Sequence, residues 1–270
     1  MKAVLRLTRH SLRRIRGLMI ASCVTLFLFQ ILLTLVARSF EMSGQFSELA
    51  NFIPAFIRPL LDQSFLASLT FSGMVSVGYS HPILLILVIA QAIAAATETT
   101  GESESKFVDL LMARPLPRRA LVARSLIVMS VLTTAAIGSM VIGTWTGLRF
   151  LAPEGAVAPT PRVVGSLAVN LSMLVLAWGS IAMAIGSWSK RRATAATVTA
   201  VLAFATFVFD FLGRLWDMLA PFGRLSPFHY YAPLPIVIGE PLDPINLVVL
   251  AGITVVASAV ALRVYGVRDL

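Results

Sequence analysis

Charged residues are scarce in this chain. They make up 13% of its 270 residues, whereas hydrophobic residues make up 57%. A soluble domain has about a quarter charged residues, because polar groups have to cover its surface. The shortage of charge therefore excludes a soluble globular protein, and the abundance of apolar residues excludes intrinsic disorder. Together with a mean hydropathy of +0.86, the composition predicts a polytopic membrane protein.

Cysteine and recognisable catalytic motifs are also lacking. Cys23 is the only cysteine, so no internal disulfide can form. The histidines His10, His81 and His229 are scattered and form no spaced metal-binding cluster. No glycine is followed by lysine, which excludes a P-loop, and neither HExxH nor GxSxG occurs. We therefore predict no catalytic residue, cofactor site or metal site in this chain.

Long apolar segments are what the chain has in abundance. A helix needs about 20 mostly apolar residues to cross a bilayer. Six segments meet this requirement, and the sequence predicts an all-α membrane protein with six transmembrane helices. The predicted spans are 18–37, 82–97 (extending back towards residue 75), 121–148, 163–188, 195–212 and 245–267.

The basic residues predict the orientation of these spans. The formal net charge is +9, and cytoplasmic loops of membrane proteins are rich in Lys and Arg. With the N-terminus inside, only six of the 22 basic residues fall outside: Arg38, Arg58, Arg149, Arg162, Arg214 and Arg224. We therefore expect both termini to be cytoplasmic and the protein to lie in the cytoplasmic membrane. The positive charge then indicates orientation and contact with lipid headgroups rather than nucleic-acid binding.

Two segments outside the spans have patterns of their own. In residues 1–17, Arg6, Arg9, Arg13 and Arg16 recur at helical spacing, which predicts an elbow helix lying in the cytoplasmic interface. The outer loop 213–244 combines aromatic residues with six prolines, which excludes a long regular helix there.

The connection 98–120, between the second and third spans, is the most informative one. It begins with the acidic residues Glu98, Glu102 and Glu104. Phe107, Leu110 and Leu111 follow at helical spacing, before a Pro-Leu-Pro stop and several arginines. The pattern predicts a short amphipathic helix in the cytoplasm. Its apolar face needs a cover, which can be the protein's own helices, lipid headgroups or another protein.

Polar residues are few inside the spans. Gln30, Gln91 and Asn170 are placed deep enough that they should face protein or a water-filled path. They are candidates for a translocation path, with structural hydrogen bonds between helices as the alternative. Gly143 and Gly147 form a GxxxG pair that allows close approach of a second helix.

The stretch ESESKFVDLLMARPLPR resembles the cytoplasmic loop of the type-2 ABC exporter permeases. Their pattern is an acid-rich stretch, a Leu-Leu pair and a Pro-x-x-Arg turn, matched here by Glu102, Glu104, Leu110, Leu111, Pro115 and Arg118. Lys106 and Phe107 stand where the family usually has Gly-Thr. LSPFHYYAP at 225–233 is similar to a segment of some six-helix members.

The resemblance implies a single permease domain over residues 1–270 that forms a homodimer and docks on a separate ABC ATP-binding subunit. ATP and Mg²⁺ would be bound by that subunit, and the 98–120 loop would be the coupling helix that receives its motion. The implied interface consists of Glu98, Glu102, Glu104, Phe107, Leu110, Leu111, Arg114, Pro115, Arg118 and Arg119. The function implied is ATP-driven export. The alternatives are a permease-like subunit that assists maturation of an extracytoplasmic enzyme, and a secondary transporter or channel independent of ATP.

Overall fold

Every regular element that the structure describes is a helix. The structure is a computed structural model, and it describes residues 2–44, 69–105 and 119–267. Six apolar stretches in these ranges are long enough to cross a membrane, which confirms the six predicted spans. They are formed by α1 (Lys2–Met42), α4 with α5 (Phe71–Ser76 and Pro82–Ala96), α8 (Arg119–Leu151), α9 (Pro161–Trp188), α10 (Arg192–Leu215) and α13 (Pro244–Val267).

Short helices connect the long ones. They are η2 (Val77–Tyr79), α6 (Glu98–Glu104), η3 (Asp217–Leu219), α11 (Ala220–Gly223), η4 (Pro227–Tyr230) and α12 (Pro233–Val237). The predicted outer loop 213–244 thus contains only short helical pieces after the end of α10. Its prolines explain this, because each one lacks the N–H that a continuing helix needs.

Two of the spanning helices start in the same way. At α9, the Thr160 hydroxyl accepts a hydrogen bond from the backbone N–H of Val163, and Pro161 follows as the first helical residue. At α5, the His81 ring nitrogen caps the helix and Pro82 takes the first position. A capping side chain followed by proline satisfies an N–H group that a helix otherwise leaves unpaired. These starts are therefore encoded locally.

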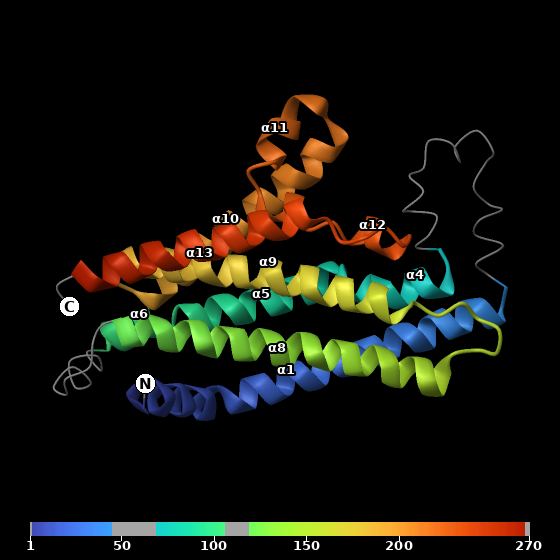
Figure 1. The fold of residues 1–270 in the computed structure, drawn as a ribbon, viewed down its shortest axis with the longest axis horizontal. Coiled ribbons are helices and arrows are strands. Elements are labelled where there is room, and N and C mark those ends of the chain that lie inside the picture. Colours follow the sequence, from blue (N-terminus) through green and yellow to red (C-terminus); the bar gives the residue numbers. More distant parts are fainter. Residues whose placement is uncertain (1, 45–68, 106–118, 268–270) are drawn as a thin grey trace.

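The helices pack side by side around α9, which lies at the centre of the bundle (Figure 1). α9 contacts α5, α8, α10 and α13, and its Trp178 is completely buried. α1 packs along α8 on the side away from α13 (Figure 1). The main core is built from apolar residues of α5, α8 and α9.

The outward faces of the bundle are apolar. Leu28 of α1 is 55% exposed, Ile86 of α5 is 68% exposed and Val255 of α13 is 66% exposed. A water-soluble bundle places polar residues on such faces, whereas lipid is the solvent in which this pattern is stable. The chain is therefore a multi-pass membrane protein.

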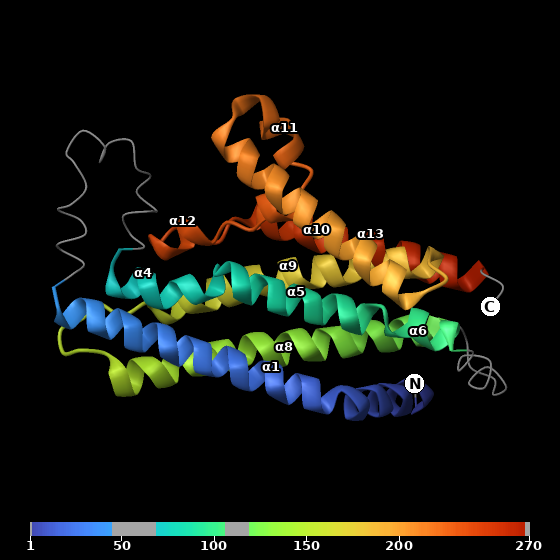
Figure 2. The same ribbon diagram turned by 180° about the vertical axis from the view of Figure 1, so that it is seen from behind.

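Both ends of the chain lie at the same end of the bundle (Figures 1 and 2). α6 lies at this end too, while α4, α12 and the connection between α8 and α9 lie at the opposite end. An even number of spans requires this arrangement. That the end with α6 faces the cytoplasm stays a prediction from the basic residues.

The structure differs from the expected elements at the N-terminus. Residues 2–17 are helical, as predicted, but they continue into the first span as one helix without a break at Gly17. The position of this segment in the membrane interface stays a prediction. The expected coupling helix divides differently as well, because its acidic residues form α6 directly after α5, and residues 106–118 lie outside the described residues.

The outer loop is tied to the bundle by aromatic residues. Phe228 of η4 packs against Trp178 of α9 and Phe207 of α10, with ring centroids 5.6 and 5.4 Å apart. The hydroxyl of Tyr231 donates to the backbone carbonyl of Tyr79 at the start of the second span. Burial raises the pKa of the Tyr231 hydroxyl, so it keeps the proton that it donates. The segment LSPFHYYAP thus packs against α9, α10 and the residues just before α5.

The predicted orientation can be tested by labelling cysteines introduced into a Cys23→Ser background. Lys106→Cys should react only from the cytoplasmic side, and Glu154→Cys only from the outside. Position 154 is exposed and avoids Gly155, whose φ of +83° disfavours other residues. The opposite labelling of the two sites would overturn the orientation.

Candidate functional site

Three of the five ion pairs found among the described residues involve α6. This helix follows α5 after one residue, Thr97, and leads directly into the 106–118 loop. Glu98 and Glu102 are 3% and 4% exposed, and Thr99 and Thr100 between them are each 1% exposed. A buried carboxylate is costly unless it is paired, so the partners of α6 decide what it can do.

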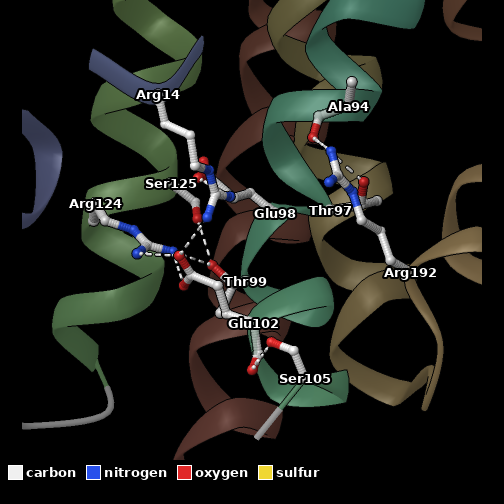
Figure 3. A network of polar contacts seen from close by, with 10 residues as sticks. All are labelled: Arg14, Ala94, Thr97, Glu98, Thr99, Glu102, Ser105, Arg124, Ser125 and Arg192. Atoms are coloured by element: carbon white, nitrogen blue, oxygen red, sulfur yellow. Dashed lines mark hydrogen bonds and ion pairs between the residues drawn. The ribbon is translucent and has the colours of Figure 1, made fainter. Parts of the chain in front are cut away.

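Two arginines from different helices neutralise the two buried carboxylates (Figure 3). Arg124 of α8 donates two hydrogen bonds to Glu102, at 3.0 and 2.6 Å. Arg14 of α1 contacts Glu98 at 2.5 Å and lies 3.8 Å from Glu102. Bidentate arginine–carboxylate pairs of this kind are geometrically specific and strong. The cluster therefore joins α1, α6 and α8 without net charge.

Hydroxyl groups extend the contacts of α6. Thr99 lies 2.7 Å from the Ser125 hydroxyl of α8, and also accepts a hydrogen bond from Arg124 at 3.1 Å. Thr100 donates to the backbone carbonyl of Gly186 in α9 at 3.1 Å and lies 3.0 Å from the hydroxyl of Tyr265 in α13. These hydroxyls therefore bond α6 to α8 again and to two further spanning helices, α9 and α13.

The sixth spanning helix is joined to α6 through Arg192 at the start of α10. Its backbone N–H donates to Glu104 at 2.9 Å. Its guanidinium donates to the carbonyl of Ala94 in α5, also at 2.9 Å (Figure 3). Its side chain also packs so closely on Gly101 that a Cβ there would lie 2.8 Å from it. α6 thus continues from one spanning helix and contacts the other five.

A polar cavity of about 820 Å³ lies beside this network. It is lined by residues of α1 and α6, among them His10, Arg14, Glu98 and Glu102, and by Arg192. Water can reach the carboxylates from this side. The described part of the chain has no group of His, Cys, Asp and Glu residues that could hold a metal ion.

A second cavity, of about 280 Å³, opens between α5 and α10. Its walls are entirely apolar and include Phe204, Phe207 and Phe228. It offers van der Waals contact and no hydrogen bond, so it suits an apolar molecule or acyl chain.

The structure brings together only part of the predicted interface. Glu98, Glu102 and Glu104 meet in one network, but the first two point into the chain and pair with its own arginines. Arg119 begins α8, and its side chain is outside the description. The predicted residues Phe107, Leu110, Leu111, Arg114, Pro115 and Arg118 lie outside the described residues.

The candidate path residues are sealed in the core. Gln30 is 0%, Gln91 6% and Asn170 1% exposed. Among the described residues, the Gln30 amide, the Gln91 nitrogen and the Asn170 oxygen have no hydrogen-bond partner. Gln30 instead lies against Gly78 and Gly143, where a Cβ would collide with it. In this conformation the three residues do not line an open path.

Sequence reasoning missed the partners of the acidic residues. The positive-inside rule explains Arg14, Arg124 and Arg192 by orientation alone. One signal was available for Arg124, because it follows the apolar residues at the start of the third span. An arginine inside a span needs a carboxylate or a water-filled cavity.

A family model described as the C-terminal domain of the multidrug efflux system permease Rv1217c matches residues 10–265. No curated protein matches the chain. The matched range covers four of the six spans completely and most of the first and the last, and it includes the whole α6 network.

Proposed function

The chain belongs to this family of multidrug efflux permeases, and from that premise we propose that it is the membrane subunit of an ATP-driven exporter. In this proposal a separate ABC ATP-binding subunit binds ATP and Mg²⁺ and hydrolyses the ATP. This chain contributes the spans and passes the resulting motion to them. It would do so as a homodimer in the cytoplasmic membrane.

The observation that supports this proposal best is the position of α6. It continues directly into the loop that resembles the coupling helix of type-2 ABC exporters. It is also hydrogen-bonded to α1, α8, α9, α10 and α13. A displacement of the loop would therefore act on all spanning helices together, which is what an exporter driven from the cytoplasm requires.

The proposed docking surface is confined to residues 106–118 with Glu104. Glu98 and Glu102 are buried and paired inside the chain, so they support the loop rather than face a partner. Leu110 and Leu111 would fill an apolar groove on the ATP-binding subunit, and the arginines at 114 and 118 would pair with acidic residues around it.

The proposal predicts that Leu110→Asp or Leu111→Asp abolishes most of the ATPase stimulation that the complex shows with substrate. A carboxylate buried in an apolar groove loses its hydration without gaining a partner. Membrane insertion should be unchanged. The measurement is ATP hydrolysis and dye efflux in proteoliposomes that contain the permease and the co-purified ATP-binding subunit.

Val157→Asp is the matched control. It places the same charge on an apolar residue that is 79% exposed at the opposite end of the bundle. It should leave ATPase activity unchanged. If the purified permease expelled dye without ATP, driven by a proton gradient alone, the chain would be a secondary transporter and the proposal would be wrong.

A further inference from the structure

The two arginine–glutamate pairs of the network differ in how firmly they are held. The Arg124 side chain is 2% exposed, and its two terminal nitrogens are used for Glu102 and Thr99. The Arg14 side chain is 46% exposed and holds Glu98 through one short contact. Water can replace the partner of an exposed guanidinium, but separating a buried pair strands both charges. The Arg14–Glu98 pair is therefore the one that can open.

The polar cavity reaches both residues of the exposed pair but only the carboxylate of the buried one. Arg14, Glu98 and Glu102 line it, whereas Arg124 is not among its lining residues. When Arg14 leaves, water from the cavity can hydrate Glu98 without any other group moving. The Arg124 guanidinium does not line the cavity, so no water replaces Glu102 as its partner, and it stays paired with Glu102.

The cytoplasmic part of α1 buries two hydroxyl groups that lack hydrogen-bond partners among the described residues. Thr8 and Ser11 are 6% and 1% exposed, yet their hydroxyls have no hydrogen-bond partner among the described residues. Buried unpaired hydroxyls disfavour the position that buries them. The position is favoured by Arg14 and by apolar packing of Leu12 and Ile15 on α8 and α5. Opposing contributions of this kind make a segment able to adopt two positions.

The outer half of α1 is fixed, in contrast. Gly143 of α8 approaches the backbone of Phe27 so closely that a Cβ would lie 2.7 Å from its carbonyl oxygen. Gly147 packs against the side chain of Thr34, where a Cβ would lie 2.6 Å from its hydroxyl oxygen. α1 is thus anchored to α8 beyond residue 27 and attached to α6 by Arg14 at its cytoplasmic end.

We propose that Arg14 is a positioning residue that latches α1 to α6, and that its contact with Glu98 opens and closes in each transport cycle. The Arg124–Glu102 pair stays closed and keeps α6 on α8. This inference rests on the proposed function, since the motion of the 106–118 loop is what opens the latch. The cytoplasmic part of α1 then moves relative to the bundle about its glycine-packed outer half.

Cross-linking tests the latch directly. The cysteines of Arg14→Cys and Glu98→Cys, introduced into the Cys23→Ser background, are joined by a cleavable bis-maleimide. The linker is chosen to span the distance that the Arg14 and Glu98 side chains span together. The full permease with its ATP-binding subunit should lose most dye transport on cross-linking, and regain it when the linker is cleaved. Unchanged transport after complete cross-linking would show a permanent brace and overturn the latch.

Arg13→Cys with Glu98→Cys is the matched control, because residue 13 lies on another side of α1 and is exposed. This pair should not cross-link, and the reagent should leave its transport unchanged. ATPase activity and co-purification of the double-cysteine variant before cross-linking test the proposed function separately. If the wild-type permease also showed neither ATPase activity nor co-purification with an ATP-binding subunit, the proposed function would be overturned, and the latch with it.

Hydrogen–deuterium exchange of the wild-type complex gives a second test that needs no variant. Trapping with ATP and vanadate should change the exchange of residues 5–14, while residues 120–126 of α8 keep theirs. Equal exchange in residues 5–14 in the trapped and resting states would overturn the latch. A parallel change in both segments would overturn the distinction between the two arginines.

Discussion

Arg124→Met is expected to lower the free energy of unfolding by about 3–5 kcal/mol, because it leaves a buried carboxylate without its main partner. The Glu102 side chain is 5% exposed and loses both hydrogen bonds from Arg124. The remaining cation is Arg14, at 3.8 Å. The midpoint of thermal unfolding in detergent, followed by size-exclusion chromatography, should fall by several degrees.

A double-mutant cycle separates the pair from the packing of its side chains. Arg124→Met with Glu102→Leu removes both charges, and should recover much of the stability lost in Arg124→Met. Arg263→Met makes the same change at an exposed arginine of α13 and should have little effect. A double variant no more stable than Arg124→Met would show that the ion pair is not the cause.

Gly143→Ala should be the second most damaging substitution. The added Cβ would lie 2.7 Å from the Phe27 carbonyl oxygen and 3.1 Å from its Cα. Both are backbone atoms of α1, so no side chain can turn away, and α1 has to move. Overpacking of this kind costs about 1–3 kcal/mol. Because the close contact between Gly143 of α8 and Phe27 anchors α1, transport activity should fall together with stability.

Gly138→Ala is the control for that prediction. It lies in the same helix, and no atom lies within 4 Å of the position of its Cβ. Alanine is favoured over glycine in a helix by about 1 kcal/mol, so this variant should be as stable as the wild type or more so. The measurement is the midpoint of thermal unfolding of Gly138→Ala and Gly143→Ala. Equal destabilisation at 138 and 143 would contradict close packing as the cause.

The sequence alone predicted the elements that depend on one segment at a time. The six spans follow from apolar runs, because each run has to leave water whatever its neighbours are. The break-up of the outer loop follows from its prolines, which lack N–H groups. The start of α5 at Pro82 and the close approach at Gly143 and Gly147 were also predictable from local pattern.

The pairing of charges could not be predicted in this way. Glu98 pairs with Arg14, 84 positions away, and Arg192 reaches a carbonyl 98 positions away. The sequence offers many arginines near the cytoplasmic ends of spans, and positive-inside orientation explains all of them equally well. It also placed Glu98 and Glu102 on a docking surface, whereas the fold turns both inward.

The sequence by itself thus determined the class and the number of spans, and it predicted the loop that we propose as a docking surface. Only the tertiary structure decided that α6 contacts the five other spanning helices, that Arg124 is buried and that Arg14 is half exposed. The physical reason is that insertion of a span depends on its own residues. The partner of a buried charge depends on which helices become neighbours, and packing between distant segments sets that.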